Sequence, residues 1–464
     1  TASYNTAIGY QAGYSNTTGT QMVAVGFQAL RTSNADYNVG VGLGAGYSTT
    51  SGSANTIVGT SAMYYNTTGA NNVAVGYSAL SNISTASSNT AVGFQAGYNS
   101  TASYNDFFGF KAGYSVSTGQ ENTSIGRLSM GQSVTAVTGS SNVAVGTASL
   151  TALSSGGANT AVGYTALQAN TTGSSNVAIG AYTLYTNTTG TQSVAVGLYS
   201  QFAATAGSNT SVGAYSLRTL GSGAANVAVG DYAAFSSTSG NFNTAIGSGS
   251  LYSNTTASNN TAVGYQAGYS TTTGTCLTAI GTGALYSNTT APYNTAVGYN
   301  AAYSNAGIGN NAFGATALLS NTSGTNNCAF GGTDGSVIGS SLYANTTGSY
   351  NVGFGVGTLN VNTTGSYNTA IGTQALLSNT TASNNTAVGY QAGYSNTTGS
   401  GGVAVGYQAL YANTTGVQNT AVGQQALKNN TTGALNDAFG QGSMTTNTTC
   451  LLYTSDAADD TPCV

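Results

Sequence analysis

One short phrase returns throughout the chain at a nearly fixed spacing. "NTAVGYQAGYSNTTG" at 385–399 is almost repeated at 5–19 and again at 260–274. With the glycine of "AVG" as a register mark, 26 copies follow one another, and nineteen of the 25 intervals are 17 residues long. The other intervals are four of 16, one of 20 and one of 24 residues. A period this short predicts a solenoid, in which each copy forms one coil that rests on the next.

The residues within one copy predict β-structure. The ideal copy reads N-T-A-V-G-Y-Q-A-L-Y-S-N-T-T-G-x-x, and we number its positions one to 17. Position two is mostly Thr or Val, position three is small, and position four is Val, Ile or Phe in all 26 copies. This alternation is typical of a strand. We therefore predict an all-β, parallel β-solenoid or β-roll of about 26 coils over residues 1–449, each with a strand, a glycine corner, a short second strand and an "NTTG" turn.

Three positions predict how the coils pack. Position one is Asn in 22 of 26 copies, so stacked coils should align its amides in a hydrogen-bonded ladder. Position nine is Gly in seven copies, and we expect the tyrosine that follows in six of them to cover the gap left by the missing leucine. We expect the branched residues at position four to form the core column, beginning with Ile8, Val25, Val41, Val58, Val75, Val92, Phe108 and Ile125.

The composition excludes several classes of function. The chain has no histidine and only five basic residues among 464, too few for a nucleic-acid surface. Nucleophilic sites that need histidine and metal sites built on His or Cys clusters are excluded as well. The acids of the repeat array are scattered, and no apolar run is long enough to span a membrane. We expect a protein without catalytic, cofactor or metal sites, and therefore no enzyme.

The two ends of the chain differ from ordinary domain ends. The segment "CLLYTSDAADDTPCV" at 450–464 breaks the repeat and resembles a translated sequencing adapter, so we interpret it as a non-native or disordered tail. The chain starts without methionine on "TASYN", a phrase that recurs at 101–105, and we interpret it as a fragment. Cys276 and Cys328 lie about three coils apart, beyond the reach of a disulfide, and are predicted to be free thiols.

Candidate binding residues are few. Longer copies place insertions at 128–141 and 331–350, and insertions in solenoids become loops that are often on the binding face, although simple surface bulges explain them better. Asp334 in the second insertion is the first candidate. Tyrosines at positions six and ten would form an aromatic stripe for sugar rings, or would only cover the edges of the roll, which we favour. Examples are Tyr10, Tyr77, Tyr252 and Tyr411.

The strand phrases resemble a known family. "SVAVG" at 193–197, "NVAIG" at 176–180 and "NVAVG" at 72–76 resemble the head repeat of trimeric autotransporter adhesins, and similar repeats occur in tail-fibre proteins of bacterial viruses. The resemblance covers residues 1–449. It implies a left-handed, trimeric parallel β-roll that is displayed outside the cell or on a virion and used for attachment. It also implies that Val194 and Val196 point into the roll and that Ala195 faces outward.

These observations favour a structural and adhesive extracellular rod, part of a surface adhesin or virus tail fibre. Its expected partners are a host-surface receptor or glycan and further copies of the chain, as in a homotrimer. Two alternatives are an ice-binding solenoid and a non-catalytic carbohydrate-binding repeat protein. The expected inward orientation of the position-two threonines argues against ice binding. A disordered low-complexity chain is a further alternative, and the unbroken column at position four argues against it.

Overall fold

The structure, a computed structural model, describes residues 2–132, 135–333, 339–451 and 454–456, and no helix occurs in these ranges. The chain divides into two compact units, Thr1–Asn226 and Val227–Val464, each of which is described by itself. In both units every copy of the repeat forms one coil with one three-residue strand. The predicted all-β parallel solenoid with about 17 residues per coil is confirmed.

The described residues of the first unit form thirteen strands, one for each coil. They are β1 (Thr6–Ile8), β2 (Val23–Val25), β3 (Val39–Val41), β4 (Thr56–Val58), β5 (Val73–Val75), β6 (Thr90–Val92), β7 (Asp106–Phe108), β8 (Thr123–Ile125), β9 (Val143–Val145), β10 (Thr160–Val162), β11 (Val177–Ile179), β12 (Val194–Val196) and β13 (Thr210–Val212).

The second unit continues the same pattern. Its strands are β14 (Val227–Val229), β15 (Thr244–Ile246), β16 (Thr261–Val263), β17 (Thr278–Ile280), β18 (Thr295–Val297), β19 (Asn311–Phe313), β20 (Cys328–Phe330), β21 (Val352–Phe354), β22 (Thr369–Ile371), β23 (Thr386–Val388), β24 (Val403–Val405), β25 (Thr420–Val422), β26 (Asp437–Phe439) and β27 (Thr454–Asp456).

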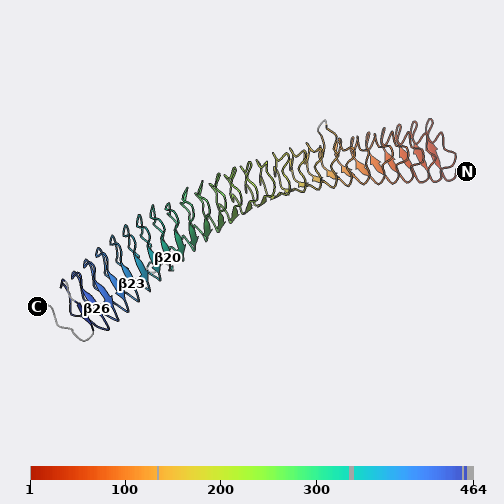
Figure 1. The fold of residues 1–464 in the computed structure, drawn as a ribbon. Helices are drawn as coiled ribbons and strands as arrows, with labels where there is room; N and C mark the ends of the chain where they lie inside the picture. Colours follow the sequence, from red (N-terminus) through yellow and green to blue (C-terminus); the bar gives the residue numbers. More distant parts are fainter. Residues whose placement is uncertain (1, 133–134, 334–338, 452–453, 457–464) are drawn as a thin grey trace. The chain divides into compact units, whose positions relative to one another are not determined.

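Within each unit every strand pairs in parallel with the strand of the next coil, and equal positions of the repeat lie opposite each other. In β15 and β16, for example, Thr244 lies opposite Thr261 and Ala245 opposite Ala262. In unit 2, Figure 1 shows β20, β23 and β26, which are three coils apart, on the same side of the coils. This register converts each repeat position into a straight column of side chains.

β27 lies in the segment 450–464 that the sequence assigned to a non-native or disordered tail. It pairs in parallel with β26, so the ladder extends past residue 449. Residues 457–464 lie outside the described residues.

The predicted glycine corner is confirmed at position five. Gly264 has a φ of +137°, where a residue with a side chain is strained, and a Cβ there would lie 2.6 Å from the Gly281 carbonyl carbon. The neighbouring coil therefore leaves no room for a side chain at this corner.

The predicted second strand is wrong. Positions seven and nine have positive φ, as in Gln28 (+55°) and Leu30 (+46°), and a strand does not tolerate this. The Gln28 N–H donates to the Tyr10 carbonyl of the preceding coil, and the Leu30 N–H donates to the Ala45 carbonyl of the following coil. This segment therefore binds both neighbouring coils through its backbone without extended geometry.

The predicted asparagine ladder is confirmed, and its asparagines are buried from Asn38 onward. The Asn38 side-chain oxygen accepts hydrogen bonds from the backbone N–H and the side-chain amide of Asn55, at 3.0 and 3.1 Å. Asn72 repeats both contacts with Asn55. A second ladder runs through the first residue of the "NTTG" turns, where the Asn413 amide donates to the Asn396 oxygen at 3.0 Å. The sequence predicted these residues only as turn formers.

Four of the gaps at position nine are filled from inside the coil. Phe107 stands at position three, where most copies have alanine, and its ring occupies the space that side chains at Gly97 and Gly113 would need. Ile57 does the same beside Gly46, and Met22 beside Gly13. The prediction that the following tyrosine covers the gap is wrong for these coils, because enlarged core residues replace the missing volume.

Candidate functional site

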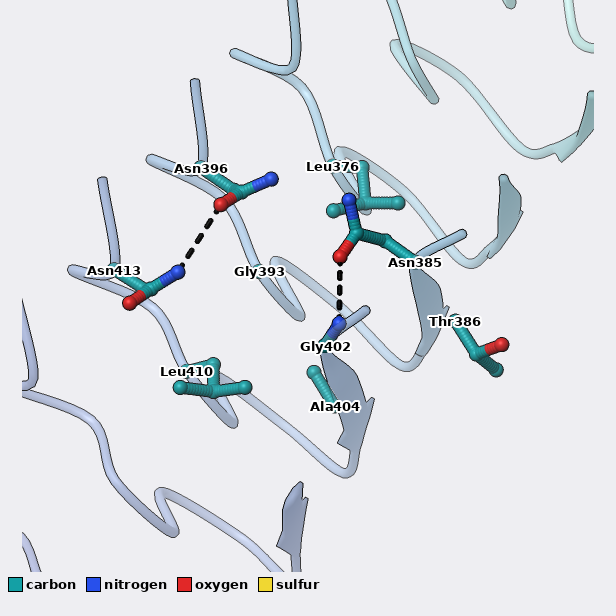
Figure 2. Close-up of a pocket in the computed structure, with 9 residues that line it drawn as sticks. All are labelled: Leu376, Asn385, Thr386, Gly393, Asn396, Gly402, Ala404, Leu410 and Asn413. Carbon is teal, nitrogen blue, oxygen red and sulfur yellow. Dashed lines mark hydrogen bonds between the residues drawn. The ribbon is translucent and has the colours of Figure 1, made fainter. Parts of the chain in front are cut away.

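The most extensive candidate site in each unit is the outer face of its strand ladder. Positions two and four point away from the coil interior, whereas the residue between them is buried. Figure 2 shows this for unit 2, where Thr386 at position two points away from the interior and Ala404 at position three points toward it. The outer face is therefore formed by one row of Thr or Val and one row of Val, Ile or Phe.

This orientation contradicts the predicted core column. Ile8 is 60% exposed, Phe108 is 38% exposed and Ile125 is 40% exposed. Val25, Val41, Val58, Val75 and Val92 are half-buried on the outer face. The alanines at position three, such as Ala262, are buried instead. The core is narrow and already holds two asparagine ladders and the position-nine leucines, so mainly small side chains fit on the inner side of the strand.

The orientation implied by the family resemblance is reversed in the same way. Ala195 is completely buried, and Val194 and Val196 are half-buried on the outer face. The signal for the correct orientation was present in the sequence. A strand alternates its side chains between two faces, so buried asparagines at position one place position three inside and positions two and four outside.

Charged residues interrupt the outer face at few points among the described residues. Asp106 and Asp437 replace the position-two residue in β7 and β26. No group of three His, Cys, Asp or Glu residues that would hold a metal ion occurs in the part of the chain that the structure describes.

Asp36 lies in a bend outside the strands. It accepts hydrogen bonds from the Thr20 backbone N–H and hydroxyl, at 2.7 and 2.8 Å, and these bonds lower the pKa of its carboxyl group.

A second repetitive surface consists of aromatic columns in the segment after the glycine corner. At position ten of unit 2, Phe235, Tyr252, Tyr269, Tyr286 and Tyr303 stack in series. The tyrosine ring centroids lie 4.8–5.1 Å apart with interplanar angles of 3–10°. The faces of the inner rings are thus covered by their neighbours.

The four predicted tyrosines all belong to such stacks. Tyr10 stacks on Phe27, Tyr77 on Phe94, Tyr252 between Phe235 and Tyr269, and Tyr411 on Tyr394. A sugar that stacks on an aromatic side chain needs a free ring face. Because the inner rings of a stack have none, the columns suit sugar stacking only at their ends.

Cations join these columns. Arg31 occupies position ten, with its guanidinium carbon 5.8 Å from the Tyr14 ring centroid and 5.4 Å from that of Tyr47. It also donates a hydrogen bond to the Tyr47 hydroxyl at 2.7 Å. A planar guanidinium can take the place of a ring in the stack, which accounts for a charged residue at this position.

The two insertions differ in what the structure describes. In the first, Val137 is buried and forms a parallel bridge with Val116, so part of the insertion joins the stack and is not a simple surface bulge. In the second, the regular coil resumes at Ser341 and Leu342, which are buried. Asp334, the predicted recognition residue, lies outside the described residues.

Both cysteines of the repeat array are free thiols, as predicted. Cys276 is exposed, and Cys328 is half-buried at position two of β20. Burial raises the pKa of the Cys328 thiol, which disfavours the reactive thiolate at neutral pH. Neither residue has the surroundings of an activated nucleophile.

A small cavity in unit 2 marks a local defect of the stack. It is lined by Leu376, Asn385, Thr386, Gly393, Asn396, Gly402, Ala404, Leu410 and Asn413, and its volume is about 10 Å³ (Figure 2). Two departures from the repeat produce it, since Gly393 replaces a position-nine leucine and Gly402 replaces a position-one asparagine. A cavity of this size holds at most one water molecule and is too small for a substrate.

Comparison with protein-family models and with curated proteins gives no match for this chain. Among the described residues, no helix has the length and apolar character needed to cross a membrane. The geometry defines a class of protein, a parallel β-solenoid with repetitive surfaces, and those surfaces are its candidate functional features.

Proposed function

We propose that this chain is a structural and adhesive rod, displayed outside the cell or on a virion, whose outer strand face packs against further copies of itself. The observation that carries the proposal is the row of Val, Ile and Phe side chains on the outside of each ladder. Apolar faces of this extent on soluble proteins usually mark interaction sites. The resemblance of the strand phrases to adhesin and tail-fibre repeats supports the attachment role.

The dimensions of this face suit a second copy of the chain. Thirteen strands spaced about 4.8 Å apart give a ladder about 60 Å long, and a three-residue strand is about 10 Å wide. Two copies meeting over one unit would bury about 1,200 Å² in total, which reaches the range of specific interfaces. The face is nearly uncharged and repeats along its length, so identical faces can meet without charge repulsion.

Sedimentation of the full chain tests this assembly. Val263→Lys together with Ile280→Lys places two charges on the outer face, and we expect the oligomer to dissociate into folded monomers. Tyr265→Lys together with Thr282→Lys puts the same charges on exposed position-six residues of the same coils and should leave the oligomer intact. A wild-type chain that remains monomeric at high concentration would refute self-association through this face.

Ice binding is a second candidate, favoured by one observation. The position-two threonines point outward, contrary to the prediction that argued against this function, and Thr244, Thr261, Thr278 and Thr295 form four successive members of one row. Thermal hysteresis of the purified chain distinguishes the candidates. The rod proposal predicts none, whereas an ice-binding face predicts hysteresis that Thr261→Lys would remove.

A further inference from the structure

The longest tyrosine run in the described residues of unit 2 is the stack of Tyr252, Tyr269, Tyr286 and Tyr303. Successive ring centroids are 5.0, 5.1 and 4.8 Å apart, and the rings are parallel within 10°. All four side chains are half-buried, so their packing is fixed while solvent still reaches them. Burial, with Tyr252 and Tyr286 nearby, raises the pKa of Tyr269, so its phenol is neutral at physiological pH.

We propose that this run is a site of oxidative cross-linking, in which neighbouring tyrosines are joined to dityrosine by a one-electron oxidant of the haem-peroxidase class. Each of two adjacent phenols gives one electron to the oxidant and its proton to solvent. The two radicals then form a carbon–carbon bond between the ring positions next to the hydroxyls. As the rings regain aromaticity, those two carbons lose their hydrogens and the oxygens are reprotonated. The net change is the loss of two electrons and two protons.

The stacked geometry favours this bond. The unpaired electron of a tyrosyl radical occupies ring orbitals that point perpendicular to the ring plane. Parallel rings direct these orbitals at each other, so the new bond forms along the stacking direction. Side chains already held as neighbours also react much faster than groups that must meet by diffusion. The product would staple one coil covalently to the next.

Two aromatic residues, Phe235 and Tyr293, separate the effect of ring stacking from the effect of solvent exposure. Phe235 continues the stack beyond Tyr252 but has no phenol and cannot be coupled in this way. Tyr293 is 64% exposed and has no ring neighbour among the described residues, so it is open to oxidation without a partner. If stacking controls the reaction, products follow the column and not the exposure of each tyrosine.

The experiment treats the dilute full chain with a haem peroxidase and hydrogen peroxide, and maps dityrosine by fluorescence and by mass spectrometry of proteolytic fragments. We expect intramolecular links between residues 252 and 269, 269 and 286, and 286 and 303. In urea their yield should fall by about tenfold or more, because unfolding separates the rings.

Two variants make the test specific. Tyr269→Phe keeps the ring and removes the phenol, so the first two links should disappear and the link between Tyr286 and Tyr303 should remain. Tyr293→Phe is the control and should leave all three links unchanged. Links that involve mainly Tyr293, or a yield that is equal in the folded and unfolded chain, would overturn the proposal.

Discussion

Single residues at the glycine corner and at the ladder positions determine whether one coil can rest on the next. A Cβ at Gly264 would lie 2.6 Å from the Gly281 backbone, and the same close approach recurs at position five along each unit. Position one, in contrast, accepts a side chain in nearly every coil. The two positions therefore predict opposite effects of adding a side chain.

Gly264→Ala should destabilise unit 2 by about 2–4 kcal/mol, because alanine is strained at this φ and its methyl group clashes with the next coil. Thermal unfolding followed by circular dichroism measures the change. An unchanged melting temperature would show that the coils are not stacked as closely as described.

Gly402→Asn should stabilise unit 2 by about 1 kcal/mol. In wild type the Asn385 side-chain oxygen accepts only the Gly402 N–H, at 2.8 Å, and Gly402 has no side-chain oxygen for the N–H of Asn419 in the next coil. An asparagine side chain restores the ladder and fills the adjoining cavity. The backbone of Gly402 is outside the left-handed region, so the substitution brings no backbone strain, and the new Cβ would lie 3.2 Å from the Asn385 side-chain oxygen, which has to shift slightly. A lower melting temperature than wild type would contradict this account.

At the scale of one coil, the repeat predicted the strand, the glycine corner and the buried asparagine ladder, because these depend on local pattern and parallel register. It did not predict the left-handed residues after the corner, since Gln28 and Leu30 carry no sequence mark of positive φ. The orientation of the strand is opposite to the prediction, because the volume available in the core, and not side-chain hydrophobicity alone, determines which position faces inward. Valines suit a core in general, but this core admits mainly alanine at position three.

The Phe107 ring, which fills the space left by the missing side chains at Gly97 and Gly113, allows a test of this dependence on core volume. Phe107→Ala should cost about 3–5 kcal/mol, because Gly97 and Gly113 leave the ring as the main filler of two coils. Adding Gly97→Leu and Gly113→Leu should recover most of the loss, since leucine adopts the same left-handed conformation at position nine elsewhere, as in Leu80. Failure of the triple variant to regain stability would show that the ring does more than fill space.

At the scale of the whole molecule, the chain carries few charges, so its pH dependence rests on a small number of groups. Burial raises the pKa of Tyr182 in unit 1 and of Tyr269 in unit 2 above the ordinary tyrosine value. The folded chain therefore keeps these protons at a pH where the unfolded chain loses them. The resulting stability is present in full below pH about 10 and is lost as the pH rises further.

We accordingly expect the melting temperature to stay level from neutral pH to about pH 9 and to fall above about pH 10. Tyr182→Phe with Tyr269→Phe should reduce the slope of that fall, because phenylalanine has no proton to lose. A melting temperature that rises in alkaline solution would contradict the direction of these shifts.

The central claim is that the strand places position three inside the coil and position four outside, and reaction of engineered thiols tests it most directly. In a chain whose four native cysteines are replaced by serine, Ala262→Cys and Val263→Cys differ by one position in β16. At dilution we expect the cysteine at 263, on the half-buried outer face, to react with a thiol reagent much faster than the cysteine at 262, which should be protected until the coil unfolds. Faster labelling at 262 than at 263 would contradict the account.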